Sequence, residues 1–147
     1  MRLKNKKIIF LNILLIVFIS AFIGIKMWNE PHKNVKDANA ISVEATELYN
    51  FFVRDSAGAK KLYENKVLII SGIVKQVSKN QGNQNIIFLK TDNNNGSINC
   101  TMEEKINNNL QQGKQVILKG ICSGYISGDV EMGLSGDVYL TRCYLSN

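Results

Sequence analysis

The sequence predicts a mainly β protein with flanking helices, in which five strands close into a Greek-key barrel. Three observations indicate this fold class. From Lys66 onward, short segments rich in β-branched residues alternate with turn signals. The first segment is too long for an ordinary strand and has Gly72 in its middle. Between the third and fourth segments, Thr101-Met102-Glu103-Glu104 matches the T-x-x-E pattern that starts a helix.

The first three strands are predicted at residues 66–78, 85–91 and 97–102, separated by turns rich in asparagine and glycine. A glycine inside a strand usually marks a bulge or a bend. Gly72 would therefore allow the first strand to serve both sides of the barrel. The third strand alternates apolar and polar residues, which is typical of a strand with one buried face.

A short helix is predicted after the capping pattern, with Ile106 and Leu110 on one face and Gly113 at its end. The fourth and fifth strands follow at 115–123 and 138–146, and their connection has room for a small hairpin. This order is that of a five-stranded oligonucleotide/oligosaccharide-binding (OB) barrel, with the helix at one end. An antiparallel sandwich is the alternative, but closure suits five strands in about 80 residues better.

An amphipathic helix is predicted before the barrel. Ser42 is a suitable N-cap, and apolar residues from Val43 to Phe52 recur at roughly helical spacing. Residues 59–63 would add a second short turn. We expect one of Phe51 and Phe52 to pack on the barrel, and the other either to pack there as well or to face a partner.

The N-terminus carries one long apolar run, residues 8–25, directly after the basic residues of segment 2–7. At roughly 1.5 Å per residue, the run crosses a hydrocarbon core about 30 Å thick. It predicts a transmembrane helix kept as a signal anchor, with a cleaved signal peptide as the alternative. The predicted organisation is a membrane anchor at 1–27, a polar stalk at 28–41 and an OB-fold domain with its leading helix at 42–147.

The net charge of +6 indicates topology rather than substrate. Four of the 18 basic residues lie within segment 2–7, which leaves 14 scattered basic residues against 12 acidic ones. This basic cluster beside the span favours a single-pass protein of a bacterial cytoplasmic membrane, with its N-terminus in the cytoplasm and its C-terminal domain in the periplasm. A protein that binds nucleic acid usually has a concentrated basic face, which this distribution does not predict.

A series of short motifs spans residues 45–145. They are Leu48, Phe52, Asp55, Ala59, Tyr63, Asn65-Lys66, Gly72-Ile73-Val74, Ile98-x-Cys100, Gly113-Lys114-x-Val116, Lys119-Gly120-x-Cys122, Gly124 and Cys143. In order and spacing they resemble the tRNA-anticodon-binding-like (tRNA_anti-like) OB-fold family of small bacterial envelope proteins. Family members are often lipoproteins, whereas this chain has no lipid-acceptor cysteine after its apolar run. The resemblance implies an OB fold and no catalytic residue, and a shared fold does not fix the ligand.

The three cysteines, Cys100, Cys122 and Cys143, lie in the predicted exported domain, where disulfides persist. Cys122 and Cys143 fall on the fourth and fifth strands, which are antiparallel neighbours in an OB barrel. We expect a disulfide between them if their Cα atoms lie within about 7 Å, with two buried free thiols as the alternative. Cys100 is expected in the core as a free thiol.

Aromatic and basic side chains on the predicted strands are candidate ligand contacts. They are Phe88, Tyr125, Tyr139, Lys75 and Lys90, with Lys119 and Arg142 as further cations. If the ligand is a nucleic acid, its bases would stack on the rings and its phosphates would contact the cations. The simpler interpretation places Phe88 in the core and the tyrosines at the barrel rim.

No catalytic, metal or cofactor site is predicted. The one histidine, His32, lies in the predicted stalk, away from any cysteine or serine nucleophile. Asp129, Glu131 and Asp137 form a weak candidate cation site, but a solvated acidic loop is the favoured interpretation. The sequence therefore predicts a module that is not an enzyme and that binds a protein or a small envelope ligand, with single-stranded nucleic acid as the disfavoured alternative.

Overall fold

The computed structural model describes residues 15, 18–20, 35–92, 96–106, 110–129 and 131–146. The chain divides into two compact units, residues 1–33 and 34–147. The predicted membrane span at 8–25 lies almost wholly outside the described residues. Among the residues that are described, no helix is long and apolar enough to cross a membrane.

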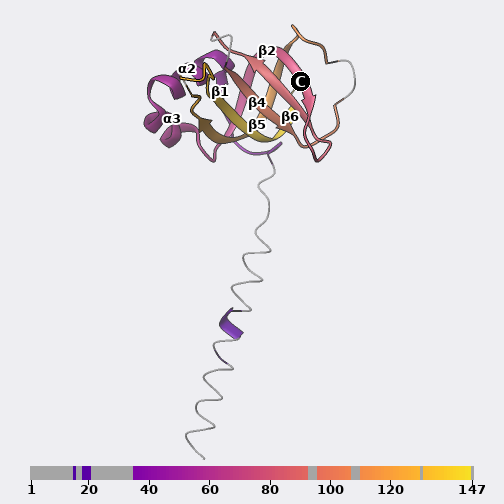
Figure 1. The fold of residues 1–147 in the computed structure, drawn as a ribbon. Helices are drawn as coiled ribbons and strands as arrows, with labels where there is room; N and C mark the ends of the chain where they lie inside the picture. Colours follow the sequence, from indigo (N-terminus) through magenta and orange to yellow (C-terminus); the bar gives the residue numbers. More distant parts are fainter. Residues whose placement is uncertain are drawn as a thin grey trace, which may run out of the picture. The chain divides into compact units, whose positions relative to one another are not determined.

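The second unit is built around a closed β-barrel (Figure 1). In the described part of the chain, six strands form one sheet in the order β1-β2-β3-β4-β6-β5, and pairing of β2 with β5 closes it. The strands are β1 (Ile41–Glu44), β2 (Val67–Lys79), β3 (Asn85–Lys90), β4 (Ser97–Met102), β5 (Gln115–Ile126) and β6 (Asp137–Leu145). Around the ring all neighbours are antiparallel except β4 and β6, which are parallel. The predicted five-stranded barrel of the OB fold is confirmed, with β1 added beside β2.

The core fills this ring. Inward and outward side chains alternate along the strands except at the bulges, as the pattern of the third predicted strand indicated. The strand residues with 0% exposure are Leu68, Ile70, Val74, Ile87, Leu89, Ile98, Cys100, Leu118, Cys122, Val138, Leu140 and Cys143.

The long strand β2 serves both sides of the barrel, as Gly72 predicted. Its first part pairs with β5, its second part pairs with β3 from Val74 onward, and a bulge lies between Val74 and Gln76. Gly72 lies next to this change of partner. A Cβ atom on Gly72 would come within 2.9 Å of the Cβ of Ala45, so this position has no room for a side chain.

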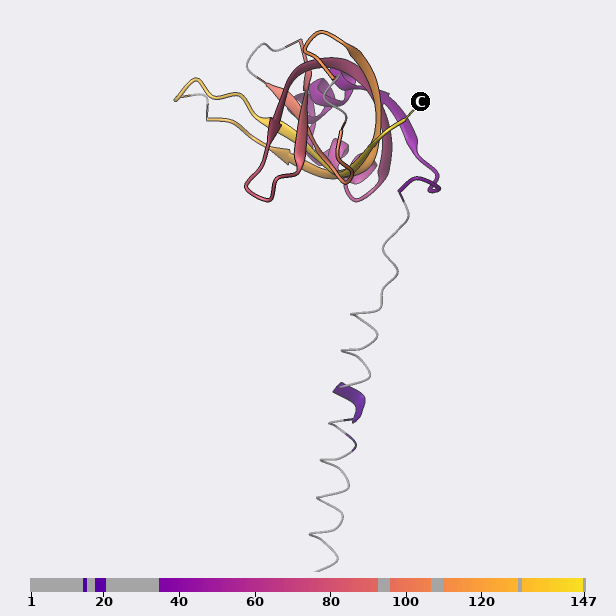
Figure 2. The same ribbon diagram turned by 90° about the vertical axis from the view of Figure 1, so that its right-hand side faces the viewer.

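Two helices cover one end of the barrel (Figures 1 and 2); they are α2 (Ala45–Arg54) and α3 (Ser56–Tyr63). α2 turns Leu48, Tyr49 and Phe52 into the core, where each is at most 2% exposed. Phe51 lies at the rim and packs edge-on against Tyr63, with ring centroids 5.9 Å apart. Both phenylalanines of the pair considered above therefore have partners within the domain.

The predicted helix start at Ser42 is wrong, because Ile41–Glu44 form β1 and the helix begins at Ala45. β1 runs parallel to the first part of β2, with Val43 opposite Ile70. Since β3 pairs only with the second part of β2, this edge would otherwise leave backbone groups without partners. The pairing with β2 outweighs the local capping signal.

The helix predicted after Met102 is also wrong for the residues described there, since 103–106 are not helical and 107–109 lie outside the described residues. The Glu103 N–H donates to the carbonyl of Cys143 (3.0 Å), and Glu104 forms an ion pair with Lys36 (2.6 Å). The Glu104 carboxylate that a capping box would need is therefore engaged elsewhere, as is one of the N–H groups of a first helical turn.

The folded unit begins before the predicted domain boundary. Val35 is only 2% exposed. The Lys36 carbonyl accepts a hydrogen bond from Lys119 Nζ (2.6 Å). The Lys36 ammonium lies 4.7 Å from the centre of the Tyr144 ring. Residues 35–40, expected as part of the stalk, therefore belong to the domain.

Candidate ligand-binding face

One row of residues crosses the outer face of the barrel. Backbone pairing places Phe88 of β3 opposite Asn99 of β4, and Asn99 opposite Tyr139 of β6. Gln76 of β2 and Gly124 of β5 extend the row at its two ends. Residues paired in this way share one face of a sheet. We call Phe88, Asn99 and Tyr139 the central row.

The central row points away from the core, because the residues next to it along each strand point inward. These inward neighbours have 0% exposure; they are Ile87, Leu89, Ile98, Cys100, Val138 and Leu140. Phe88 and Tyr139 are partly exposed. Strands that are two apart in a sheet lie roughly 9–10 Å apart, so the two rings flank the Asn99 amide.

Asn99 belongs to a hydrogen-bonded cluster with Ser97 and Asp137. Asp137 Oδ1 lies 2.8 Å from both the backbone nitrogen and the hydroxyl of Ser97, and both donate to it. Asn99 Nδ2 donates to Asp137 Oδ2 (3.3 Å), and the Ser97 hydroxyl also lies 2.9 Å from Asn99 Oδ1. Ser97 and Asn99 are buried, so this polar cluster is held in place between the two strands.

Two of the predicted lysines lie beside the central row. Lys90 is exposed and stands opposite Ser97. Lys75 lies in the β2 bulge, is half-buried and donates a hydrogen bond from Nζ to the carbonyl of Gly96 (3.4 Å). Lys90 is therefore the more available of the two lysines to a ligand.

Tyr125 is not part of the row. It pairs with the buried Val138, so its ring points inward. There it stacks on Phe52 with ring centroids 5.9 Å apart, and it meets Tyr49 edge-on at 6.3 Å. Burial raises the pKa of the Tyr125 hydroxyl, and the negative charge of Asp137 adds a smaller increase. Tyr125 joins α2 to the barrel rather than offering a stacking surface.

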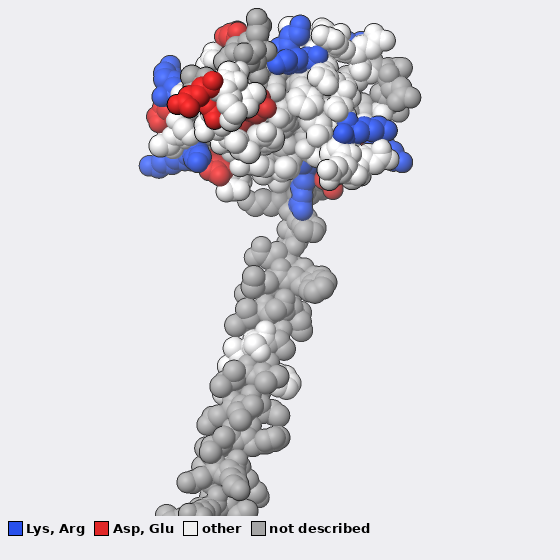
Figure 3. Space-filling model, viewed as in Figure 1, with Lys and Arg blue, Asp and Glu red and all other residues white. Residues whose placement is uncertain are grey.

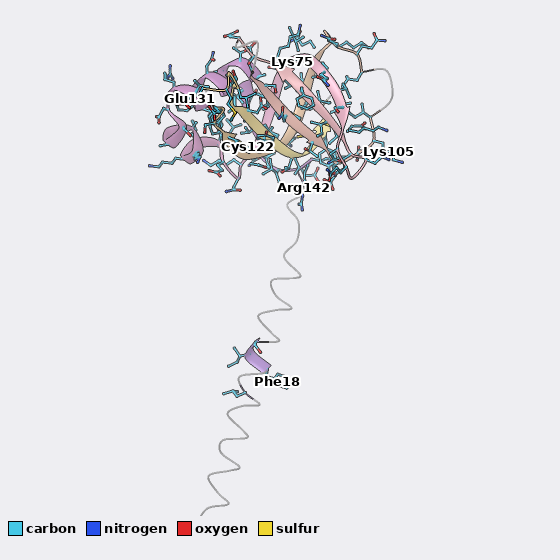
Figure 4. The ribbon with its side chains drawn as sticks, in the orientation of Figure 1. Phe18, Lys75, Lys105, Cys122, Glu131 and Arg142 are labelled. Atoms are coloured by element: carbon cyan, nitrogen blue, oxygen red, sulfur yellow. The ribbon has the colours of Figure 1, made fainter. Side chains whose placement is uncertain are left out.

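The other two predicted cations lie elsewhere. Lys119 holds the carbonyl of Lys36, and Arg142 lies at a bulge in β6 with a φ of 51°. In the view of Figure 4, Lys75 lies at the upper side of the barrel and Arg142 at the lower side. On the face drawn in Figure 3, basic and acidic side chains are intermixed. All four predicted cations are described, and they do not form one patch.

The predicted disulfide between Cys122 and Cys143 is absent. All three cysteines lie in the described part of the chain, and all are buried free thiols. Cys122 is opposite Leu140, whereas Cys143 is opposite Met102 on the other neighbouring strand. Cys143 packs against Gly120, two residues before Cys122 along β5, so the two cysteines are not opposite each other.

The acidic residues near the β5–β6 connection have local roles. Asp129 Oδ1 accepts hydrogen bonds from the N–H groups of Glu131 (2.9 Å) and Met132 (3.2 Å), which orders its own turn. Asp137 belongs to the cluster with Asn99. His32 lies outside the described residues. In the part of the chain that is described, no group of three or more His, Cys, Asp or Glu side chains could hold a metal ion.

Asn99 is the site residue that sequence reasoning missed, and Asp137 was considered only for a weak cation site with Asp129 and Glu131. The outward position of Asn99 follows from the alternation of the third strand. Its partner is less accessible to prediction, because the hydrogen bonds between β4 and Asp137 join residues about 40 positions apart. Only the parallel pairing of β4 with β6 brings them together.

Comparison with known proteins gives one family and several distant structural likenesses. The family model described as tRNA_anti-like matches residues 1–132. No curated protein sequence matches the chain. A crystal structure of a protein assigned as an aspartyl-tRNA synthetase from Leishmania major Friedlin is similar over 80% of this chain and 22% of that chain, with 8% identity and a TM-score of 0.39. At that identity and TM-score, the likeness carries no information about function.

Proposed function

Because the chain belongs to the tRNA_anti-like family, we propose that it is a non-catalytic binding protein that holds an OB barrel outside the cytoplasm on a membrane anchor. Its ligand is a segment of a protein or a small molecule of the cell envelope. The ligand binds on the outer face of the barrel at the central row of Phe88, Asn99 and Tyr139.

The arrangement of the central row is the observation that carries this proposal. Two partly exposed rings lie on either side of one amide, on three neighbouring strands of a closed barrel. Aromatic side chains combine a large contact area with few rotatable bonds, and they are enriched at binding sites. Because the polar cluster between the rings is already hydrogen-bonded, a ligand needs to order little on binding.

The negative charge beside the central row favours a ligand with a hydrogen-bond donor over a ligand with a phosphate. The carboxylate of Asp137 lies within hydrogen-bond distance of Asn99 and Ser97. A nucleic-acid strand would bring negative phosphates near this carboxylate, which repels them. An N–H or O–H group on an uncharged ligand would instead find an acceptor there. The intermixed charges in Figure 3 support the same choice.

Single-stranded nucleic acid is the second candidate, because two aromatic rings with the exposed Lys90 beside them also suit stacked bases. The two candidates differ in their dependence on salt. Binding of an oligonucleotide through its phosphates weakens steeply as salt is added. Fluorescence anisotropy with a labelled oligonucleotide measures this, and absence of binding at low salt would eliminate the second candidate.

The placement outside the cytoplasm is supported by the basic residues of segment 2–7 ahead of the apolar run at 8–25. Protease treatment of cells tests it. We expect the C-terminal domain to be degraded once the outer layers are made permeable and the cytoplasmic membrane is intact. A domain that is protected until the cytoplasmic membrane itself is opened would contradict this placement.

A photoreactive amino acid in place of Phe88 tests the binding face in cells. We expect irradiation to give a covalent adduct at position 88, whose chemical class mass spectrometry identifies. The matched control replaces Val53, which is 55% exposed on α2 and away from the row. An adduct at position 53 and none at position 88 would contradict the proposed face.

A further inference from the structure

We propose that two copies of the chain form a symmetric dimer, in which the tip of the β5–β6 hairpin of one copy packs against the end of helix α3 of the other. The hairpin tip is residues 126–136, of which residue 130 lies outside the described residues, and the α3 end is residues 60–66. This contact goes beyond the proposed function, since it involves neither the central row nor the location of the domain.

The hairpin tip carries the most exposed large apolar side chains of the folded unit. Among the described residues of that unit, Met132 (70% exposed), Ile126 (63%) and Leu134 (58%) rank highest. Figure 2 shows the connection between β5 and β6 projecting from the barrel. Single exposed apolar residues are ordinary on a protein surface, but three of them on one projecting loop indicate a surface that another molecule covers.

The hairpin tip has a fixed shape, because hydrogen bonds within it order the loop. The Leu134 N–H donates to the carbonyl of Asp129 (2.8 Å), and Asp129 Oδ1 accepts from the N–H groups of Glu131 and Met132. A Cβ atom on Gly128 would overlap the Leu134 carbonyl oxygen, so glycine lets the two arms of the loop meet. A partner therefore meets apolar side chains that are already in place, which lowers the entropy lost on association.

The charged residues of the hairpin tip are all acidic. No lysine or arginine occurs from residue 120 to residue 141, whereas Asp129 and Glu131 lie beside the exposed apolar side chains. A surface of anionic lipid would repel this tip, and so would a strand of nucleic acid. The partner that suits it is therefore a protein surface that combines basic and apolar side chains.

The α3 end has this complementary character on the same chain. Lys60, Lys61 and Lys66 are exposed around Leu62, which is itself 44% exposed. None of the three lysines forms an ion pair with another described residue, and neither does Glu131 of the hairpin tip. Opposite charges and exposed apolar side chains are thus available on both surfaces of each copy.

The two surfaces adjoin each other at one end of the barrel. The Asn65 N–H, just after α3, donates to the carbonyl of Cys122 on β5 (2.8 Å). Glu64 lies against Gly124, two residues before the hairpin tip, since a Cβ atom on Gly124 would be 3.3 Å from Glu64 Oε1. A two-fold axis between adjoining surfaces of opposite charge places each against the other in the second copy. Contacts of this isologous kind close as dimers rather than as open chains.

Sedimentation equilibrium of the full-length protein in density-matched detergent micelles tests the contact by charge reversal. We expect an equilibrium between monomer and dimer. Glu131→Lys and Lys61→Glu should each raise the dissociation constant of the dimer about tenfold, because either change places like charges at two equivalent contacts. The combined variant restores opposite charges and should return the constant to within about threefold of the unsubstituted protein.

Lys79→Glu is the matched control, because it reverses a charge at an exposed site at the far end of β2 from α3. It should leave the dissociation constant unchanged. A protein that is monomeric at every concentration, or a dimer that either reversal leaves intact, would overturn the proposal. Single variants that weaken the dimer without recovery in the combined variant would overturn it as well.

A photoreactive amino acid in place of Met132 distinguishes a second copy from other occupants in cells. We expect a cross-linked product of twice the chain mass, in which peptide mapping joins position 132 to residues 60–66. The same probe in place of Gln81, in the exposed turn between β2 and β3, should give no such product. An adduct of position 132 with a lipid or with a different protein, and none with a second copy, would overturn the proposal.

Discussion

Replacing Gly72 with alanine tests why the long strand β2 needs a glycine where it changes partner. The new Cβ atom would lie 2.9 Å from the Cβ of Ala45 and 3.2 Å from Leu89 Cδ1. Carbon atoms pack at about 3.5–4.0 Å, so the helix start and β2 must move apart by several tenths of an ångström. Overpacking of this kind costs about 2 kcal/mol. With a urea m-value of about 1–2 kcal/mol/M, the unfolding midpoint falls by about 1–2 M.

A double-mutant cycle with Ala45→Gly identifies the clash as the cause. Ala45 is 1% exposed at the start of α2, and its loss alone costs about 1 kcal/mol from burial and helix propensity. Removing its methyl group makes room for the new one at position 72. The double variant is therefore expected to lose only about 1 kcal/mol, rather than the sum of about 3 kcal/mol.

Urea unfolding of the full-length protein in detergent, followed by circular dichroism, measures all four free energies of unfolding. Ala57→Gly is the matched control, because it places a glycine at an exposed site in α3. Its effect should add to that of Gly72→Ala. If Ala45→Gly and Gly72→Ala also add within about 0.5 kcal/mol, the steric explanation is refuted.

Three further predictions concern the core, the buried thiol and the docked N-terminal segment. Phe52→Ala removes a ring with 0% exposure and should lower the free energy of unfolding by about 3–5 kcal/mol in the same urea assay. Val53→Ala, at a site that is 55% exposed, should change it by less than about 0.5 kcal/mol. Equal effects of the two variants would contradict the inward face of α2. Burial raises the pKa of the Cys122 thiol from 9.0 to about 11, so the neutral thiol stabilises the fold below pH 9. Roughly 2 kcal/mol of the free energy of unfolding should be lost as the pH rises through 11. Thermal unfolding across pH 8–11 should therefore show a smaller loss of stability in Cys122→Ala than in the unsubstituted protein. Val35→Ala should lower the free energy of unfolding in urea by about 1–2 kcal/mol. Lys36→Ala should lower it by less than about 1 kcal/mol, and by less still in high salt, because both side chains of its ion pair are exposed. A larger loss for Lys36→Ala than for Val35→Ala would contradict this prediction.

The strands were predictable because their signals are local. The predicted strand at 97–102 agrees with β4 at both ends, since alternation alone marks it. The two helix starts at Ser42 and Thr101 failed for a shared reason. In each case a capping residue is present, but a distant strand or side chain engages the backbone first. A capping pattern indicates the hydrogen bonds that a helix start would form, but it carries no information about distant groups that bond the same residues.

The candidate site was predictable only one residue at a time. Phe88 and Tyr139 stood out as aromatic residues on strands, and the structure brings both to the central row. Tyr125 looked equivalent in sequence but points inward, because its partner Val138 is a core residue. The cysteine pairing failed because the strand register places Cys143 beside Gly120 rather than opposite Cys122.

The order of the strands has a consequence for how the protein folds. β6 is the last of the described strands in sequence, yet it lies between β4 and β5 in the sheet. Until it arrives, the edges of both neighbours are unpaired and the ring cannot close. The closing contacts are distant in sequence, such as Val67 with Ile121 in β2 and β5, and proteins rich in such contacts fold slowly. If the domain crosses the membrane as proposed, the unclosed sheet persists until β6 has emerged, and during this interval an assisting protein can reach both its open edges and its cysteines.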